Sequence, residues 1–510
     1  MNNFSIRRFS TSPSSCVPTN SNSVKSSTLG ILGGRIRDVI PVPHRTIPEP
    51  RGQDLDFVNV AHSHLIHSDW EKLNALSTHL TPFRVKHMLL KVQKDYVLSL
   101  EFFNWIKTQN PCSLTLDTYS MIMHILTKYR KFKSAESILR SIYVPGSIDF
   151  PSKLFEATLY SYRLCDSSPR VFDMLFKCYA HMKKFRNATD TFCQMKNYGF
   201  LPTVESCNAY LSSLLDSDRS DIALAFYREM KRHRISPNVF SFNMVMSAYG
   251  KLGKLEKGIE VFRGMEKMGV GHNVASYNTL IAGYCNKGLL ELALKLKNSM
   301  GKNEVHPNVV TFNALICGFC KEGKLHEANK LFSEMKAVNV SPNTVTYNTL
   351  INGYSQMGNS EVGGSLYEEM ARNEVKADVL TYNALILGLC KEGQCVRRNS
   401  DRAFQLYKIM VRSGCHPNEH TFRMLISTFC KNEDFDGALL VLEEMIERAI
   451  PPDLSILSEI YDRLCLCGKD ELAMKLCSKM EARCLMPEGF DKMRTSAQDQ
   501  INENKVIEKL

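Results

Sequence analysis

One asparagine recurs every 35 residues through the middle of this chain. The copies at the fifth place of six successive sequence repeats are Asn208, Asn243, Asn278, Asn313, Asn348 and Asn383. A carboxamide offers two N–H donors and an oxygen acceptor. A row of identical amides predicts hydrogen-bonded recognition, because a side chain that recurs at one place in stacked repeats lines a continuous surface.

A second row of polar side chains closes the same repeats. It consists of Asn238, Asn273, Asn308, Asn343, Asp378 and Asn418. Asn or Asp directly before a helix is a good N-cap, and such a cap contributes about 0.5–2 kcal/mol. Capping therefore explains this row adequately, alone or together with recognition. Capping does not explain the first row, which lies inside a predicted helix where Asn has mediocre propensity.

Catalytic and metal-binding motifs are weak in this sequence. His416 and His420 have the spacing of two zinc ligands on a helix, but the accompanying Glu is missing and Pro417 lies between them. Cys465 and Cys467 form a close pair without a second pair to complete a zinc site. Phosphate-binding loops, dinucleotide turns and nucleophile elbows are missing from the sequence. We therefore expect no catalytic residues, no metal site and no cofactor.

Two helices in each repeat must carry these rows. In residues 309–343, an apolar set at helical spacing, a glycine and a second apolar set predict helix, turn and helix. In order, these residues are Phe312, Leu315, Ile316, Phe319, Gly323, Ala328, Leu331, Phe332 and Met335. Such a short unit cannot bury its own apolar face, so neighbouring units must stack. The sequence predicts an all-α fold, a right-handed superhelical solenoid of helix-turn-helix repeats whose first helices line the inner groove.

The repeat pattern also divides the chain. We expect a linker or irregular segment over 38–80, degenerate repeats with an irregular insert over 81–168, tandem repeats over 169–488 and a polar tail over 489–510. The tandem units are 169–203, 204–238, 239–273, 274–308, 309–343, 344–378, 379–418, 419–453 and 454–488. Unit 379–418 is five residues longer than the others, which predicts an enlarged loop over Gln394–Asp401.

Composition is that of a folded protein with ample core material. The chain has 510 residues, of which 44% are hydrophobic, and contains no apolar run long enough to span a bilayer. Its net charge of +11 is compatible with a polyanionic partner and equally with an ordinary solvated surface. The twelfth place of the repeats holds Cys285, Cys320, Cys390, Cys430 and Cys465. These cysteines indicate soft packing side chains too far apart for disulfides, and hence a reducing compartment.

The first 37 residues have the composition of a targeting segment. They contain no Asp or Glu and carry Arg7, Arg8, Lys25, Arg35 and Arg37 among many serines. A secretory signal needs an apolar block that is missing here, whereas Arg- and Ser-rich, acid-poor composition is typical of transit peptides. We predict a mitochondrial transit peptide over 1–37, with the plastid as alternative destination and a disordered basic tail as the structural alternative.

The repeats resemble the pentatricopeptide repeat family of plant organelles. The resemblance rests on the 35-residue length, the Thr-Tyr-Asn type of start, Gly at the fifteenth place, Met at the twenty-seventh and a closing Pro-Asn or Pro-Asp. It covers 169–488 well and 81–150 loosely. Uniform units resemble the purely repetitive P class, which is associated with RNA stabilisation, splicing, end maturation or translation. RNA-editing members carry a deaminase-like domain with His-x-Glu and Cys-x-x-Cys signatures. His-x-Glu is missing here, and the one Cys-x-x-Cys, formed by Cys317 and Cys320, lies inside a repeat.

By this resemblance, each repeat reads one base of single-stranded RNA with its fifth and last residues. The implied pairs are Asn208 with Asn238, Asn243 with Asn273, Asn278 with Asn308, Asn313 with Asn343, Asn348 with Asp378, and Asn383 with Asn418. In the family, Asn with Asn favours cytosine and then uracil, and Asn with Asp favours uracil. The implied core target is therefore 5′-Y-Y-Y-Y-U-Y-3′. Three further pairs depart from the pattern: Asp173 with Thr203, Arg423 with Asp453, and Ser458 with Glu488.

The second and thirteenth places complete the predicted site. The second place is expected to wedge beside each base, with packing between repeats as the alternative, and it holds Phe240, Ala275, Val310, Val345 and Leu380. The thirteenth place is expected either to meet phosphates or to complement the helix dipole, and it holds Lys251, Lys321, Lys391 and Lys431.

The sequence thus favours a monomeric, sequence-selective RNA-binding adaptor without catalysis or membrane association. Its expected partners are single-stranded organellar RNA and other RNA-processing proteins. The alternative is a solenoid scaffold that binds proteins in a mitochondrial complex. The fifth-place asparagines separate the two, because a groove for peptides has no need of identical amides at every repeat.

Overall fold

The computed structural model describes residues 39–43, 46–143, 153–392 and 397–482. Across these residues the secondary structure is helical and contains no strand, as the sequence predicted. Residues 170–482 form nine consecutive helix pairs. The predicted transit peptide at 1–37 and the predicted polar tail at 489–510 lie outside the described residues.

Each pair consists of a first and a second helix of similar length. The first helices are α8 (Arg170–His181), α10 (Val204–Asp216), α12 (Val239–Lys251), α14 (Val274–Asn286), α16 (Val309–Lys321), α18 (Thr344–Gln356), α20 (Val379–Lys391), α22 (Glu419–Lys431) and α24 (Leu454–Leu466). The second helices are α9 (Phe185–Asn197), α11 (Ser220–Arg232), α13 (Leu255–Lys267), α15 (Leu290–Lys302), α17 (Leu325–Ala337), α19 (Ser360–Arg372), α21 (Arg397–Arg412), α23 (Phe435–Glu447) and α25 (Asp470–Ala482).

Side-chain caps determine where the first helices begin. Before α16, the Asn308 side chain accepts a hydrogen bond of 3.1 Å from the backbone N–H of Thr311, and the Thr311 hydroxyl accepts one of 3.1 Å from the backbone N–H of Asn308. This reciprocal capping box satisfies donors that a helix start leaves unpaired. The same box precedes α12, α14, α18, α20 and α22. The capping function of the last-place residues is therefore confirmed.

Glycines end the first helices and let them approach one another. Gly323 follows α16 with a φ of 70°, the left-handed conformation predicted for it. Gly353 in α18 instead permits close packing, because a Cβ there would lie 2.9 Å from the Sγ of Cys320. Burial raises the pKa of that free thiol to about 12. The cysteine at the twelfth place thus packs between helices, as predicted.

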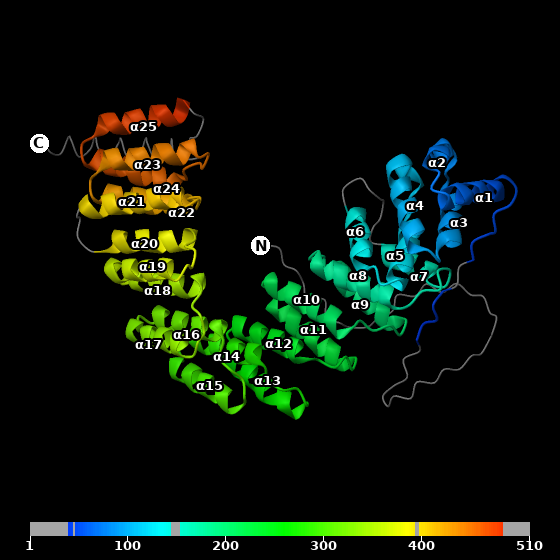
Figure 1. The fold of residues 1–510 in the computed structure, drawn as a ribbon, viewed down its shortest axis with the longest axis horizontal. Helices are drawn as coiled ribbons and strands as arrows, with labels where there is room; N and C mark the ends of the chain where they lie inside the picture. Colours follow the sequence, from blue (N-terminus) through cyan, green and yellow to red (C-terminus); the bar gives the residue numbers. More distant parts are fainter. Residues whose placement is uncertain (1–38, 44–45, 144–152, 393–396, 483–510) are drawn as a thin grey trace, which may run out of the picture.

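The helix pairs follow one another along a curved path (Figure 1). In the lower part of that view, α12, α14 and α16 lie on the inside of the bend, and α13, α15 and α17 lie on its outside. Successive first helices pack against each other. An aromatic side chain at the fourth place anchors each layer and is at most 2% exposed at Phe242, Tyr277, Phe312, Tyr347 and Tyr382.

An irregular group of helices precedes the pairs. It comprises α1 (Gln53–Ile66), α2 (Trp70–Ala75), α3 (Pro82–Val92), α4 (Tyr96–Gln109), α5 (Leu116–Lys128), α6 (Phe132–Ile142) and α7 (Leu154–Ser161), with 3₁₀ turns at Ser77–His79 and Pro111–Ser113. The expectation of a linker or irregular segment over 38–80 is wrong for α1 and α2. Val58, Ala61 and Leu65 make α1 amphipathic, and it buries them in the core that α3 shares.

The enlarged loop expected at Gln394–Asp401 is smaller than predicted. Residues 393–396 lie outside the described residues, but helix α21 already begins at Arg397. Ala403, Tyr407 and Met410 continue the buried face of this helix at helical spacing. Part of the insertion therefore lengthens the second helix instead of the loop.

Candidate nucleic-acid interface

In five successive units, the structure brings the fifth and the last residue of the same unit into direct contact. The fifth-place amide Nδ2 donates to the last-place side-chain oxygen at 3.0 Å for Asn208 and Asn238, and at 2.9 Å for Asn348 and Asp378. Three more pairs bond in the same way at 3.1–3.3 Å, namely Asn243 with Asn273, Asn278 with Asn308 and Asn313 with Asn343. One residue comes from the second turn of a first helix and the other from the N-cap of the next first helix.

The sixth pair, in the longer unit, is linked less directly. Both Asn383 and Asn418 accept hydrogen bonds from the Thr421 hydroxyl, at 2.8 and 3.0 Å. The direct amide contact of the other five pairs does not occur between these two described residues. They share one network, but with a different mutual orientation.

The N-cap geometry orients each last-place side chain. In the Asn348 pair, the Oδ1 atom of Asp378 accepts from the backbone N–H of Thr381 at 2.9 Å and from Asn348 Nδ2. A backbone N–H can only donate, so the atom that faces it must be an oxygen. In the Asn–Asn pairs the same requirement points the last-place Nδ2 away from the cap. An asparagine there presents unused donors, and Asp378 presents its second carboxylate oxygen, an acceptor.

Asp378 remains ionised in this setting. Burial by itself would raise its pKa, but the hydrogen bonds from the Thr381 backbone, the Asn348 amide and the Thr381 hydroxyl together hold the pKa below its usual value. The unit that contains Asp378 therefore differs from its neighbours by carrying a charged acceptor where they carry an amide donor.

The second-place side chains are exposed beside these pairs. The exposed fraction is 59% for Phe240, 58% for Val310, 56% for Val345 and 64% for Leu380, and Ala275 is exposed as well. Packing between repeats would bury them, so the packing alternative does not describe these residues. Apolar side chains held in solvent at one place of five successive repeats are available to a ligand.

Two hollows lie along the first helices. One of about 410 Å³ is lined by Val345, Asn348, Asp378, Leu380 and His420, among others. Another of about 860 Å³ is lined by residues that include Asn273, Ala275, Asn278, Asn308 and Val310. Each hollow therefore combines amide or carboxylate groups with second-place apolar side chains.

The thirteenth-place lysines reach back toward the preceding repeat. Lys251 Nζ donates to the carbonyl oxygen of Leu215 at 2.7 Å, near the end of α10, and forms an ion pair with Asp218 at 3.0 Å. Lys321 and Lys391 donate to the side-chain oxygens of Asn286 and Gln356, at 3.5 and 2.5 Å. Lys251 thus fits the helix-dipole interpretation, whereas within the described part of the chain Lys321 and Lys391 bond to neutral side chains.

In the units that flank the six pairs, the fifth- and last-place side chains differ in type and bond to each other. Asp173 accepts from the Thr203 backbone N–H at 2.7 Å and from its hydroxyl. At the other end, the Arg423 guanidinium binds Asp453 and donates to Ser455 at 2.9 Å. The fifth and last places of these units are occupied by each other. In the last unit, Glu488 lies outside the described residues.

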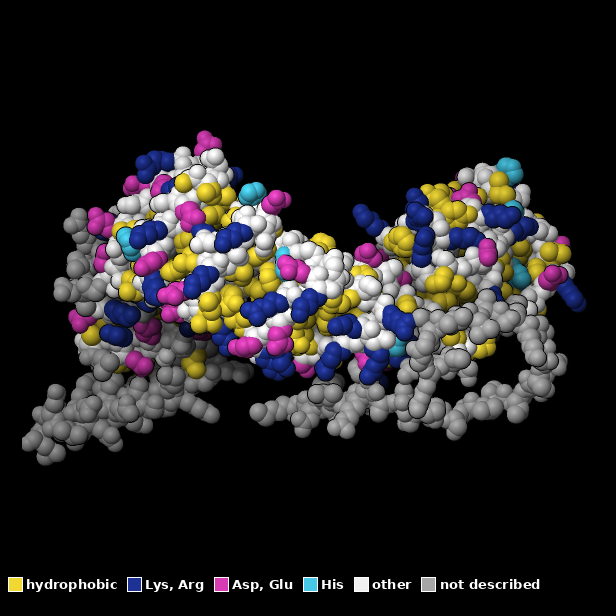
Figure 2. All heavy atoms as spheres, turned by 90° about the horizontal axis from the view of Figure 1, so that it is seen from below, with side chains coloured by type: hydrophobic (Ala, Val, Ile, Leu, Met, Phe, Trp, Pro, Cys, Tyr) yellow, Lys and Arg dark blue, Asp and Glu magenta, His cyan; other side chains and the backbone are white. Residues whose placement is uncertain are grey.

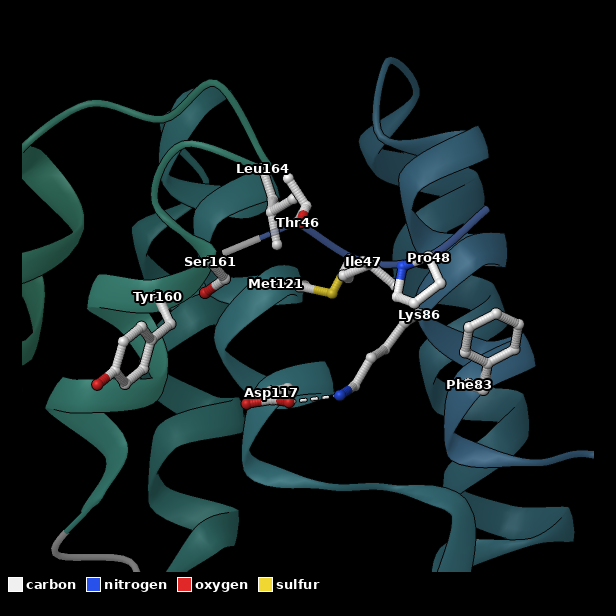
Figure 3. Close-up of a pocket in the computed structure, with 10 residues that line it drawn as sticks. All are labelled: Thr46, Ile47, Pro48, Phe83, Lys86, Asp117, Met121, Tyr160, Ser161 and Leu164. Atoms are coloured by element: carbon white, nitrogen blue, oxygen red, sulfur yellow. Dashed lines mark hydrogen bonds and ion pairs between the residues drawn. The ribbon is translucent and has the colours of Figure 1, made fainter. Parts of the chain in front are cut away.

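In the N-terminal helices, the chain covers the corresponding surface itself. Figure 3 shows a pocket of about 260 Å³ where Ile47 and Pro48 lie near α3 and α5, with Lys86 bonded to Asp117. Deeper in the same helices, His124 of α5 is fully buried; its Nε2 lies 2.8 Å from the Thr158 carbonyl oxygen in α7, and its Nδ1 lies 2.7 Å from the Ser167 hydroxyl.

The face at the bottom of Figure 1 carries charged side chains of both signs. Figure 2 looks onto the face that lies at the bottom of Figure 1, and Lys and Arg side chains there are interspersed with Asp and Glu. In the described part of the chain, no helix is long and apolar enough to cross a membrane. The same residues contain no cluster of His, Cys, Asp or Glu that could hold a metal ion.

Fold and site together define a helical-repeat solenoid whose first helices carry a row of polar pairs. The PPR repeat family model matches residues 202–248, 272–321, 307–356, 342–391 and 392–431, and a PPR repeat model matches 170–200, 240–270 and 420–450. These matches cover more than half of the chain, which therefore belongs to the pentatricopeptide repeat family.

Similar proteins come from Arabidopsis thaliana. A mitochondrial pentatricopeptide repeat-containing protein is 72% identical over 189 residues, which are 37% of this chain and 36% of that protein. A second mitochondrial member is 28% identical over 208 residues, 39% of this chain and 28% of that protein. The matched region thus spans about a third of these relatives. The first of these relatives is named as a mitochondrial protein, which agrees with the destination predicted from the N-terminal composition of this chain.

Two solved structures are similar in outline. The pentatricopeptide repeat protein PPR10 in complex with an 18-nt psaJ RNA element is 20% identical, covers 84% of this chain and 70% of its own, and has a TM-score of 0.46. Yeast Rmd9p in complex with a 16-nt target RNA is 11% identical, covers 88% of this chain and 95% of its own, and has a TM-score of 0.35.

Proposed function

We propose that this protein is a sequence-selective, single-stranded RNA-binding adaptor of mitochondrial RNA metabolism. Each of the six pairs of fifth- and last-place residues, from Asn208 to Asn418, binds one base. Together they bind an RNA core of the form 5′-Y-Y-Y-Y-U-Y-3′. The protein acts by occupancy and without catalysis. It holds one unstructured stretch, shields it from nucleases or competing base pairing, and leaves adjacent RNA open to factors for stabilisation, splicing, end processing or translation.

The observation that carries this proposal is the orientation of the polar pairs. An Asn–Asn pair presents amide donors, which complement the N3 and O2 acceptors of cytosine. The Asn348 and Asp378 pair adds a charged acceptor, which complements the N3–H donor of uracil. The two pyrimidines therefore correspond to the two kinds of last-place side chain.

The second-place side chains support one base per repeat. Val345 and Leu380 line the same hollow as Asn348 and Asp378. A base in this hollow would bring its edge to the polar pair and its faces to the two apolar side chains. Contacts of this kind contribute roughly 1–3 kcal/mol per base when the side chain is aromatic and less when it is aliphatic.

The pyrimidine code is too permissive to select a transcript alone. A choice between pyrimidine and purine at six places selects about one site in 64, whereas a transcriptome offers very many competing sites. Selection of one target therefore requires further discrimination from the outer units or from protein partners of the adaptor.

A gel-shift assay with unstructured RNA tests the proposal. The wild-type protein is expected to prefer a strand with the core CCCCUC over a strand with purines at the same places. Asn313→Ala and Asn348→Ala should each reduce discrimination at one base. Asn298→Ala is the control, because Asn298 is exposed on the second helix α15, outside any pair and outside both hollows. Unchanged selectivity in both variants would refute the residue assignment. Absence of RNA binding by the wild-type protein would favour a protein-binding scaffold.

A further inference from the structure

Each of the six fifth-place asparagines accepts a hydrogen bond from a Ser or Thr hydroxyl of the following unit. The third residue of the following unit is always Ser or Thr, and its hydroxyl donates to the Oδ1 of the preceding asparagine at 2.6–2.8 Å. The hydroxyls belong, in order, to Ser241, Ser276, Thr311, Thr346, Thr381 and Thr421. These residues mark the start of each repeat in the sequence, but their contact with the asparagines is visible only in the structure.

The hydrogen of this hydroxyl has one favourable acceptor, the asparagine Oδ1. In the repeat at α20, the Thr381 oxygen accepts a hydrogen bond from the Asp378 backbone N–H at 3.0 Å. Its own hydrogen then donates to Asn348 Oδ1 at 2.6 Å, the shorter of its two oxygen contacts, since Asp378 Oδ1 lies at 3.1 Å. The backbone thus orients the hydroxyl, and the hydroxyl orients the amide.

An unsupported amide has two nearly isosteric orientations. Rotation by a half turn would exchange the oxygen and the nitrogen of Asn348, so that its oxygen would face the oxygen of Asp378. The Thr381 hydroxyl and the Asp378 oxygen together favour the observed orientation, with the nitrogen toward Asp378. Whether the pair presents a donor or an acceptor to a base depends on this orientation.

We propose that the third-place hydroxyls are positioning residues that determine base selectivity. They hold each reading asparagine in a single orientation before RNA arrives, so that binding does not have to order the amide. This inference rests on the proposed function and assigns to it six side chains outside the pairs. The hydroxyls act through the asparagines and need not touch the RNA.

The end of the row is consistent with this assignment. After unit 419–453 the third place holds Ile456, which has no hydroxyl, and the fifth place of that unit is Arg423 instead of Asn. Arg423 is occupied by Asp453 and Ser455. In the units described, a fifth-place asparagine is thus always accompanied by a hydroxyl from the next unit.

Four variants of the full chain separate positioning from other roles. Thr381→Val removes the hydroxyl and keeps the shape of the side chain, and Thr381→Ser keeps the hydroxyl and removes a methyl group. Thr108→Val is the matched control, because Thr108 is exposed on helix α4, away from the pairs, and its hydroxyl donates to the Trp105 carbonyl of its own helix. Ser276→Ala, which acts on Asn243, repeats the test in another unit with a smaller change of structure.

The measured quantity is the ratio of affinities for RNAs with uracil or cytosine opposite the Asn348 pair. Thr381→Val is expected to reduce this ratio by about 3–10-fold, the effect of one lost hydrogen bond. Thr381→Ser and Thr108→Val should retain the wild-type ratio, and Ser276→Ala should change the preference only at the base opposite Asn243. Circular dichroism establishes that each variant is folded.

Different outcomes identify which statement fails. A folded Thr381→Val protein with weaker binding but an unchanged ratio would reduce Thr381 to a helix cap and overturn the inference. A ratio equally low in Thr381→Ser would assign the effect to packing and overturn it too. If the wild-type protein binds RNA without preferring uracil at this place, the base-reading part of the proposed function fails first, whatever the variants do.

Discussion

The inner helices of this solenoid use their polar side chains in two different ways. Around α5, these side chains bond to other parts of the chain. The fully buried His124 contacts the Thr158 carbonyl oxygen of α7, and Lys86 forms an ion pair with Asp117. From α10 to α20, the fifth-place asparagines of the first helices share hydrogen-bond networks with last-place Asn or Asp side chains, and these networks retain unused donors and acceptors. We call the region around α5 closed, because its polar groups bond within the chain, and the region from α10 to α22 open, because some of its polar groups remain unused.

An inserted helix accounts for the difference. Helix α7 packs against α5 and contributes the oxygens of Ala157 and Ser161 to the Ser120 hydroxyl, which occupies a fifth place. In the regular repeats the next first helix takes that position. Its hydroxyl bonds the amide oxygen and its N-cap side chain accepts from the amide nitrogen, which leaves the second N–H donor of the amide unused. Internal hydrogen bonds therefore account for the polar side chains at α5, whereas from α10 onward the proposed function assigns them to base recognition.

The largest expected effect is acid destabilisation confined to the closed region. Burial lowers the pKa of His124 from 6.5 to about 4, so the folded state binds its proton less readily than the unfolded state. Stability from this group is complete above the unfolded pKa of 6.5 and is lost as the pH falls toward the folded value, by about 3 kcal/mol in total. Hydrogen exchange should show α5 and α7 opening in this range before α14–α18 do.

A His124 variant isolates this effect. His124→Gln keeps a polar side chain but does not titrate in the range, so α5 and α7 should lose their acid-dependent opening while starting from lower stability. RNA selectivity at neutral pH should not change. If both regions opened together in the wild-type protein, the contrast in buried titratable groups would not govern their stability.

The next effect reverses base selectivity in the open region. Asp378→Asn replaces the charged acceptor with an amide donor in the same N-cap, so the preference of the Asn348 pair should change from uracil to cytosine. A changed base contact is worth about 1–3 kcal/mol, and the ratio of affinities for the two RNAs measures it. Asp221→Asn, at an exposed position on α11, is the charge-matched control and should leave this ratio unchanged.

Much of the fold can be predicted from the sequence, because every repeat contains the same signals for where its helices begin, end and pack. Asn308 and Gly323 mark the two ends of α16, and the buried Phe312 lies at the spacing that predicts its inward face. Helices α1 and α2 could not be predicted in this way, because neither recurs. Their existence depends on burial against α3, a contact between segments that no period relates.

The residues of the candidate site follow from the periodicity of the sequence, but their mutual geometry does not. Periodicity singles out Asn348 and Asp378, and it cannot state that they bond to each other or that Thr381 orients both. The sequence also does not distinguish exposure from packing at Leu380, since an apolar residue in a helix is more often buried than free. Only the arrangement of neighbouring helices decides these points.

A smaller effect is expected from the exposed apolar side chains. Leu380→Ala should weaken RNA binding by about 1 kcal/mol, because less apolar surface is covered by the base, and the ratio of affinities for uracil and cytosine should persist. Folding stability should hardly change, since the side chain is already 64% exposed. Leu440→Ala, which alters a side chain that is 52% exposed on the second helix α23, serves as control and should not affect affinity. A loss of stability in Leu380→Ala would instead indicate packing between repeats.

The smallest expected effect separates two lysines at the same repeat position. Lys251 is bound to the Leu215 carbonyl and to Asp218, whereas Lys321 is held only by a 3.5 Å contact with the Asn286 amide oxygen. A lysine that neutralises one phosphate of a single strand contributes about 0.7 to the slope of log affinity against log salt concentration. Lys321→Gln should reduce the slope by about this amount, while Lys251→Gln should leave the slope unchanged and weaken the end of α10. Equal slopes for both variants would mean that these lysines complement helix ends throughout, and that RNA affinity comes from the pairs and wedges alone.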